Sequence, residues 1–301
     1  MIPGRPRCSA ESVGRDEELF ATASLVNTWI LFEQPGAWGP DALTESGFPE
    51  SARPLTEAAN RLGIRTLLIR RRNGEDRPPV VYLATSGGPD RQPWLVAGSF
   101  ADPAEIAALD IAGLVEGTMP EFGQAVEDPI YLVCTHGRHD ICCADNGRPL
   151  YRAMSQLQPD QTWEVSHIGG DRFAGNVLVL PRGDYFGRVE PEDAAHLVAE
   201  YEAGRLDLSH HRGRSIHPRL VQAAEHFLRE SMGLSGLDDL TVVAYRRSGH
   251  EHAEVVFRVP EGIDYRVQVA ARELPQQEYL TCRAEEPGRG VAYDRLSLTQ
   301  D

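Results

Sequence analysis

A repeated order of strand and helix patterns most constrains how this chain of 301 residues can fold. The first set predicts a strand, a helix, three strands and a helix, at 28–34, 56–62, 66–70, 80–85, 94–100 and 102–110. The second set repeats that order at 130–134, 148–157, 162–166, 177–180, 185–189 and from 190 onward. The distance along the chain between matching elements of the two sets falls from 102 residues at the first strand (28 to 130) to 88 at the last helix (103 to 191). Because this distance is not constant, a duplicated fold and two generic α/β layers both agree with the pattern.

The order strand, helix, strand, hairpin, helix is that of a thioredoxin-like domain, in which helices cover the faces of a central sheet. After about His217 the pattern changes to one amphipathic helix, 217–232, and then to strand patterns at 240–245, 255–259 and 265–269. We therefore predict an α/β protein of three domains: a thioredoxin-like α/β domain at 1–119, a second thioredoxin-like domain at 120–209 and a small α+β module at 210–301. Trp29, Trp94 and Trp163 lie in strand patterns and are expected in the core, whereas His210 and His211 are expected in a polar linker.

The chain carries a strongly negative charge, with 45 acidic and 30 basic side chains and a net charge of −15. Such a surface repels phosphate backbones and anionic lipid, so neither nucleic acid nor a membrane is expected as a partner. The N-terminal stretch lacks the apolar region of a signal peptide, and no later run approaches the ~18 apolar residues of a spanning helix. The expected location is the cytoplasm.

Three of the five cysteines lie in one short stretch, "YLVCTHGRHDICCADNG", at 131–147. The stretch follows a predicted buried strand, at the end of the sheet where reactive groups collect. In a reducing compartment, clustered cysteines are more often metal ligands or reactive thiols than disulfide partners. Cys134, Cys142 and Cys143 are therefore informative, while Cys8 and Cys282 stand alone in the sequence.

A second ligand-bearing loop follows a later strand of the same predicted sheet. In "EVSHIGGDRF", His167 and Asp171 are separated by a Gly-Gly turn, which lets the backbone approach a bulky group closely. Thiolates bind zinc or iron–sulfur clusters, and imidazole binds zinc, copper and iron. Because each loop comes directly after a strand, we expect both to face one inorganic centre.

These two loops carry a resemblance to a known family. The spacing Cys134-x8-Cys143 followed by His167-x3-Asp171, within "VCTHGRHDICC" and "SHIGGDRFAGNVLVLPRGDYFGRV", resembles the sucrase/ferredoxin-like family. The stretches "CSAESVG" and "ILFEQPGAWGPDAL" are similar to the same family, so the resemblance covers most of the chain. It implies that 120–209 is a thioredoxin-like ferredoxin domain. No carboxylate pair suited to sucrose hydrolysis stands out.

The resemblance also implies a [2Fe–2S] cluster with mixed Cys/His ligation. Its ligands would be Cys134, Cys143, His167 and the residue at 171, where bis-histidinyl members have His and this chain has Asp171. With an oxidised 2+ core, two thiolates and two imidazoles give a net charge of zero, whereas one carboxylate gives −1 and disfavours reduction. The potential should then fall toward the lower side of the gap between roughly −150 to +300 mV for Rieske centres and about −400 mV for plant-type clusters.

Other ligand sets remain open at this point. Zinc is an alternative cofactor, bound by Cys134, His136, His139 and Cys142, although structural zinc usually joins ligand pairs that are further apart in sequence. Cys142 is otherwise expected to be a bystander, because neighbouring side chains on an extended loop point to opposite sides. If Asp171 is not a ligand, the next candidates are Cys8, Cys142 and Cys282. A metal-free thioredoxin-like binding protein is the third alternative.

The predicted function is electron transfer. A one-electron carrier is favoured over a catalyst with its own substrate, because no substrate pocket can be argued from these residues. Its partner would be a reductase or acceptor protein, and the negative charge suits docking on a basic face of that partner.

Overall fold

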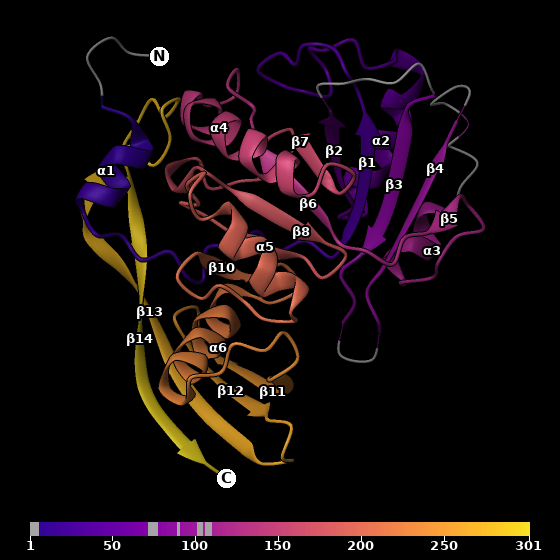
Figure 1. The fold of residues 1–301 in the computed structure, drawn as a ribbon. Coiled ribbons are helices and arrows are strands. Elements are labelled where there is room, and N and C mark those ends of the chain that lie inside the picture. Colours follow the sequence, from indigo (N-terminus) through magenta and orange to yellow (C-terminus); the bar gives the residue numbers. More distant parts are fainter. Residues whose placement is uncertain (1–5, 72–77, 89–90, 101–104, 106–109) are drawn as a thin grey trace.

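The computed structural model of this chain describes residues 6–71, 78–88, 91–100, 105 and 110–301. Its described strands form a ten-stranded sheet in the order β10-β9-β8-β6-β7-β2-β1-β3-β4-β5 and a four-stranded sheet in the order β11-β12-β13-β14. The large sheet lies above the small one in Figure 1, with helices packed around it. The fold is therefore α/β, as predicted.

The first half of the large sheet follows the predicted order closely. Its elements are β1 Thr28–Glu33, α2 Arg53–Arg61, β2 Arg65–Arg70, β3 Val80–Thr85, β4 Trp94–Ser99, α3 Ile111–Val115 and β5 Gln124–Ala125, with the 3-10 turn η1 Glu50–Ala52 before α2. Strand β1 is parallel to β2 and antiparallel to β3. The helix predicted at 102–110 lies almost entirely outside the described residues.

The second half repeats this arrangement. Its elements are β6 Ile130–Cys134, α4 Ile141–Leu157, β7 Thr162–Val165, η3 Asp171–Phe173, β8 Val177–Leu180, β9 Asp184–Phe186 and α5 Ala194–Glu202. Strand β6 is parallel to β7 and antiparallel to β8, as β1 is to β2 and β3. The halves join where β2 and β7 pair antiparallel, so one sheet runs through both. The repeated pattern in the sequence thus appears as a repeated strand order.

Helix α4 begins earlier than predicted, at Ile141 rather than Arg148. The Asp140 side chain caps it by accepting a hydrogen bond from the Cys142 N–H, and Pro149 lies inside the helix instead of at its start. Gly147, which reads as a loop residue, packs so closely on β6 that an added Cβ would overlap the Cys134 carbonyl oxygen. Close packing inside the helix, and not a helix end, thus explains Gly147.

One apolar core fills the inner face of the curled large sheet. Trp29 and Leu31 from the first half pack in the same cluster as Leu132 and Trp163 from the second. Trp29 and Trp163 are fully buried, as predicted, while Trp94 is half-buried. All five residues of β6 are buried, the pattern expected for a strand covered on both faces. The sheet is therefore a rigid base for the loops at its end.

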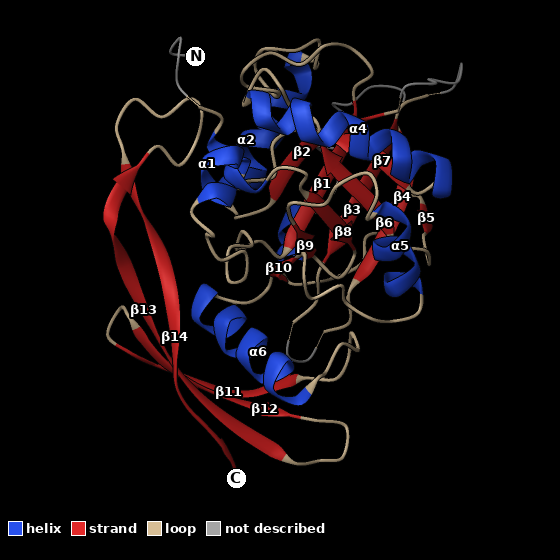
Figure 2. Ribbon diagram, turned by 60° about the vertical axis from the view of Figure 1, so that its left-hand side comes forward, coloured by secondary structure: helices blue, strands red, loops and turns tan. Residues whose placement is uncertain are grey.

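The C-terminal region contains β10 His211–Arg214, α6 Arg219–Met232, β11 Thr241–Ser248, β12 His252–Arg258, β13 Asp264–Glu278 and β14 Gly288–Gln300. Helix α6 packs on the small sheet, and the long β13–β14 hairpin rises past it toward α1 Cys8–Gly14 (Figure 2). Two strands of this region, β10 and β14, were not predicted. The polar stretch around His211 is no linker but β10, which is buried because it pairs with β9. Charged residues such as Asp294 interrupt the apolar alternation of β14.

Asp184, at the start of β9, provides a test of this packing. It is buried, and its Oδ2 accepts a hydrogen bond from the Tyr201 hydroxyl at 2.8 Å and lies 3.4 Å from Arg182 Nε. Burial alone would raise the pKa of Asp184, but His211 and Arg182 hold it well below its usual range. Its charge therefore stabilises the fold above the unfolded-state pKa of about 3.9, and this contribution is lost as pH falls below that value.

We expect Asp184→Asn to lower the free energy of unfolding by about 3–5 kcal/mol at pH 7, because it removes a buried charge that pairs with both Arg182 and buried His211. The difference from wild type should shrink below about pH 4. Urea denaturation followed by circular dichroism measures both. The matched control is Asp238→Asn, an exposed partner of the same Arg182 at 2.7 Å, which should cost less than about 1 kcal/mol. Equal losses in the two variants would contradict this account.

Candidate metal centre

Two of the predicted ligands lie at the junction of β6 and α4. Cys134 is the last residue of β6, and Cys143 lies in the first turn of α4, which Asp140 caps. Both thiols are 1 % exposed. A hydrogen bond from the Cys143 thiol, opposed by burial and aided by His167, holds the pKa of Cys134 well below its usual range. The same hydrogen bond, together with burial, raises the pKa of Cys143.

The other two predicted ligands come from the loop after β7. Because β6 and β7 are parallel neighbours, their following loops meet at the same end of the sheet. His167 Nδ1 lies 2.9 Å from Asp171 Oδ1, and Cys143 Sγ lies 3.4 Å from that oxygen. The ligand atoms of Cys134, Cys143 and His167 lie within 4.8 Å of one another. The structure thus groups Cys134, Cys143 and His167, and Asp171 contacts two of them, His167 and Cys143.

The protonation of His167 and Asp171 depends on this proximity. Burial alone would lower the pKa of His167, but Asp171 and Cys134 raise it to about 9. Burial alone would raise the pKa of Asp171, but His167 lowers it below its usual value. Without a metal, the imidazolium and the carboxylate therefore form a buried ion pair at neutral pH. A metal would replace the imidazole proton, since it binds the neutral ring.

A residue that the sequence did not indicate supports the Gly-Gly turn. Arg212, from β10, is fully buried and donates hydrogen bonds to the Gly169 carbonyl at 3.1 Å and to Asn176 Oδ1 at 2.7 Å. Asn176 in turn donates to the Gly170 carbonyl at 2.8 Å. Gly170 has φ +83°, and an added Cβ there would overlap the Arg212 guanidinium. Hydrogen bonds from Arg212 and Asn176 therefore fix the turn between His167 and Asp171.

The two histidines of the Cys/His stretch have different positions. His136 Nε2 lies 2.7 Å from the Gly39 carbonyl, and its Nδ1 accepts a hydrogen bond from the His167 N–H at 3.2 Å, so both ring nitrogens are occupied. The His139 ring stacks on His167 with centroids 3.8 Å apart and groups with His167 and Asp171. Burial lowers the pKa of both His136 and His139. His136 orients the loop, while His139 stays within reach as an alternative ligand.

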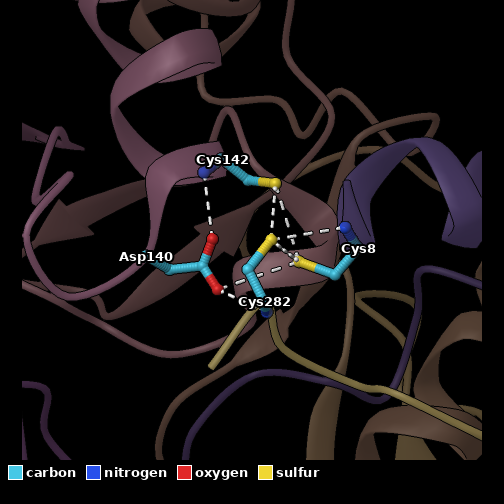
Figure 3. A group of neighbouring side chains, drawn as sticks. All are labelled: Cys8, Asp140, Cys142 and Cys282. Carbon is cyan, nitrogen blue, oxygen red and sulfur yellow. Dashed lines mark hydrogen bonds between the residues drawn. The ribbon is translucent and has the colours of Figure 1, made fainter. Parts of the chain in front are cut away.

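Cys142 lies outside the group of Cys134, Cys143 and His167, as expected of a bystander to that site, but it is not isolated. Cys142 Sγ lies 3.6 Å from Cys8 Sγ and 3.4 Å from Cys282 Sγ, in a separate buried group (Figure 3). Cys142 and Cys143 lie on a helix and not on an extended loop, so their side chains diverge by about 100° toward different groups. The structure therefore does not bring together the zinc set Cys134, His136, His139 and Cys142.

The site opens on one side. A cleft of about 590 Å³ is lined by His139 and His167, by the 40–45 loop and by Arg65 and Arg283. His167 keeps 22 % of its side chain exposed, whereas Asp171 keeps 4 %. The imidazole edge of the centre is thus accessible from solvent while the thiols are covered.

The donor set fits the group that the resemblance implies. Two buried thiols at the junction of β6 and α4 and an imidazole from the facing loop are the donor types of a mixed Cys/His iron–sulfur centre. His167 Nδ1, 2.9 Å from Asp171 Oδ1, would bind the metal in place of the proton that it holds in the ion pair.

Comparison with known proteins identifies the family to which these ligand loops belong. A family model described as sucrase/ferredoxin-like matches residues 19–214, which include both ligand loops. The chain belongs to the sucrase/ferredoxin-like family. This confirms the resemblance over both halves of the large sheet, up to the end of β10, while the stretch "CSAESVG" at 8–14 lies outside the matched residues.

Curated relatives of this family member share shorter regions. The protein named Altered inheritance of mitochondria protein 32 is 35 % identical over 85 residues in Meyerozyma guilliermondii and 32 % identical over 91 residues in Debaryomyces hansenii. These matches cover 25 % and 27 % of this chain and 30 % and 33 % of the two relatives. The matched region is thus about a third of the relatives' length.

A solved structure, the thioredoxin-like [2Fe–2S] ferredoxin from Aquifex aeolicus, matches with 20 % identity and a TM-score of 0.28, over 31 % of this chain and 97 % of that protein. In the described part of the sucrase/ferredoxin-like chain, no helix has the length and apolar character needed to cross a membrane.

Proposed function

We propose that this protein transfers single electrons by means of a [2Fe–2S] cluster bound by Cys134, Cys143, His167 and Asp171. The observation that carries the proposal is that the end of β6, the first turn of α4 and the loop after β7 place two buried thiols and an imidazole within 4.8 Å of one another. When bound, the cluster supplies reversible one-electron chemistry. Membership of the sucrase/ferredoxin-like family supports this choice of cofactor.

The chain's own residues would hold and tune that centre. The lowered pKa of Cys134 favours the thiolate that binds metal. Asp171 adds a negative charge beside the site and so disfavours the reduced state. The covered thiols and the exposed imidazole edge leave the cleft beside His139 and His167 as the approach for a redox partner.

The proposal includes a partner protein with a basic docking face, since the chain has a net charge of −15. A reduction rate that does not depend on salt would contradict this part. The five cysteines are all free, which suits a reducing compartment such as the cytoplasm.

Substitutions at Asp171 test whether the proposed cluster is bound there. Replacing Asp171 by His should raise the reduction potential toward the Rieske range of roughly −150 to +300 mV, because a neutral imidazole replaces a carboxylate. Asp171→Ala should change the visible spectrum or release the cluster. Potentiometric titration monitored by visible absorption measures both changes and checks that one electron is transferred.

The matched control is Asp145→Ala, which removes a half-exposed carboxylate from α4 that pairs with Arg7 and leaves the centre intact. Its potential should equal that of the wild type. Unchanged spectra and potentials in both Asp171 variants would remove Asp171 from the ligand set. A colourless wild-type protein with zinc in this site would contradict the proposal as a whole.

A further inference from the structure

A second group of thiols lies apart from the proposed cluster site. Cys8 comes from α1, Cys142 from the first turn of α4, and Cys282 from the loop between β13 and β14. Their sulfur atoms form a triangle with sides of 3.4, 3.5 and 3.6 Å (Figure 3). The three side chains are buried, and none forms a disulfide. Three distant segments of the chain thus converge on one point.

Asp140 completes this group. Its Oδ2 lies 3.9 Å from Cys8 Sγ, and the four ligand atoms lie within 4.8 Å of one another. The carboxylate also accepts hydrogen bonds from the Cys142 N–H at 2.9 Å and the Cys282 N–H at 2.7 Å. Asp140 therefore fixes the backbone of two of the cysteines and still faces the third.

The size and chemistry of the group match one tetrahedral ion. Zinc–sulfur bonds of about 2.3 Å in a tetrahedron place the sulfurs about 3.8 Å apart, a few tenths of an ångström more than the observed separations. A disulfide would use only two of the three thiols and would leave the third buried without a partner. Four protein ligands with no open position are typical of structural zinc sites.

The surroundings also suit a negatively charged set of ligands. The Cys8 N–H points at Cys282 Sγ at 3.5 Å, and Ser9 donates to Cys142 Sγ. Cys142 lies at the N-terminus of α4, a helix of 17 residues whose dipole favours negative charge at this end. These donors offset part of the cost of burying thiolates.

We propose that Cys8, Cys142, Cys282 and Asp140 bind one Zn²⁺, which ties α1 and the β13–β14 hairpin to the start of α4. This site is independent of the electron-transfer proposal, since it shares no ligand with Cys134, Cys143, His167 or Asp171. Its role is structural: zinc links the two ends of the chain to the large sheet.

The test uses the full chain with Cys134 and Cys143 both replaced by Ala, so that zinc at the other site does not contribute. This variant, purified under reducing conditions, should contain one zinc per chain by plasma mass spectrometry. Replacing its zinc by Co²⁺ should give the thiolate-to-cobalt absorption of a tetrahedral site. Adding Cys282→Ala or Cys8→Ala should abolish both, while the iron content of the same single variants made in the wild-type chain stays unchanged.

Thermal unfolding of the wild-type chain supplies a readout that needs no variant. Chelator treatment should lower the Tm, and added zinc should restore it by mass action. Zinc that persists when Cys8, Cys142 and Cys282 are all replaced would overturn the proposal. So would a reduced, zinc-free chain whose Tm does not respond to zinc, or an intact mass showing a disulfide within the trio. Iron lost from the Cys282→Ala variant of the wild-type chain would likewise overturn the independence of the two sites.

Discussion

Cys143→Ala is expected to abolish the visible absorption of the protein and to lower its iron content by at least about tenfold, since loss of even an outer-shell partner typically costs 10–100-fold in metal affinity. Cys143 supplies one of the two buried thiols that face His167 and Asp171. Its replacement leaves an apolar methyl group where a thiolate must bind. Iron and acid-labile sulfide per chain, measured after anaerobic purification, check the expectation.

The matched control for this variant is its neighbour in the chain. Cys142→Ala removes a thiol of equal burial that points into the group with Cys8 and Cys282. It should therefore keep the visible bands and the iron. The opposite pattern, with bands lost in Cys142→Ala and kept in Cys143→Ala, would move the cluster to the other group of thiols.

Gly170→Ala should destabilise the fold by about 2–5 kcal/mol and reduce cluster occupancy. Two costs add: a left-handed backbone costs about 1–2 kcal/mol for a residue with a Cβ, and overlap in a packed site costs about 1–3 kcal/mol. The added methyl group would overlap the buried Arg212 guanidinium, which supports the turn between His167 and Asp171. The loop that carries His167 and Asp171 therefore depends on this contact.

Gly204→Ala separates these two costs. Gly204 also has a positive φ, +74°, but open space surrounds its added Cβ. This variant should lose only about 1–2 kcal/mol and keep its visible absorption. Urea denaturation and absorbance per chain compare the two variants. Equal losses of stability with unchanged absorbance would show that Arg212 does not position the ligand-bearing turn.

The sequence indicated the two ligand-bearing loops, but it did not indicate the residues that fix these loops in position. Strand patterns at 130–134 and 162–166, each followed by a ligand-bearing loop, indicated two loops that face each other, and the parallel pairing of β6 with β7 agrees. Arg212 could not be found in this way, because its local sequence is polar and reads as a linker. Its burial results from pairing with β9, which only the folded sheet reveals.

Long-range contacts explain the other difference. Cys8, Cys142 and Cys282 are separated by 134 and 140 positions, so no spacing pattern relates them. The long β13–β14 hairpin brings Cys282 back to α1, but β14 itself escaped prediction because its charged residues interrupt the alternation. Local patterns therefore indicated one pair of loops, while the second group became visible only in the fold.

The central claim is that Cys134, Cys143 and His167 hold a two-iron cluster, and electron paramagnetic resonance tests it most directly. The anaerobically purified wild-type chain, reduced with dithionite, should give the signal of one unpaired electron per chain, with a line shape that changes in Asp171→His. Re-oxidation should remove the signal. A chain that stays silent after reduction, contains no iron and holds zinc at Cys134 and Cys143 would contradict the claim.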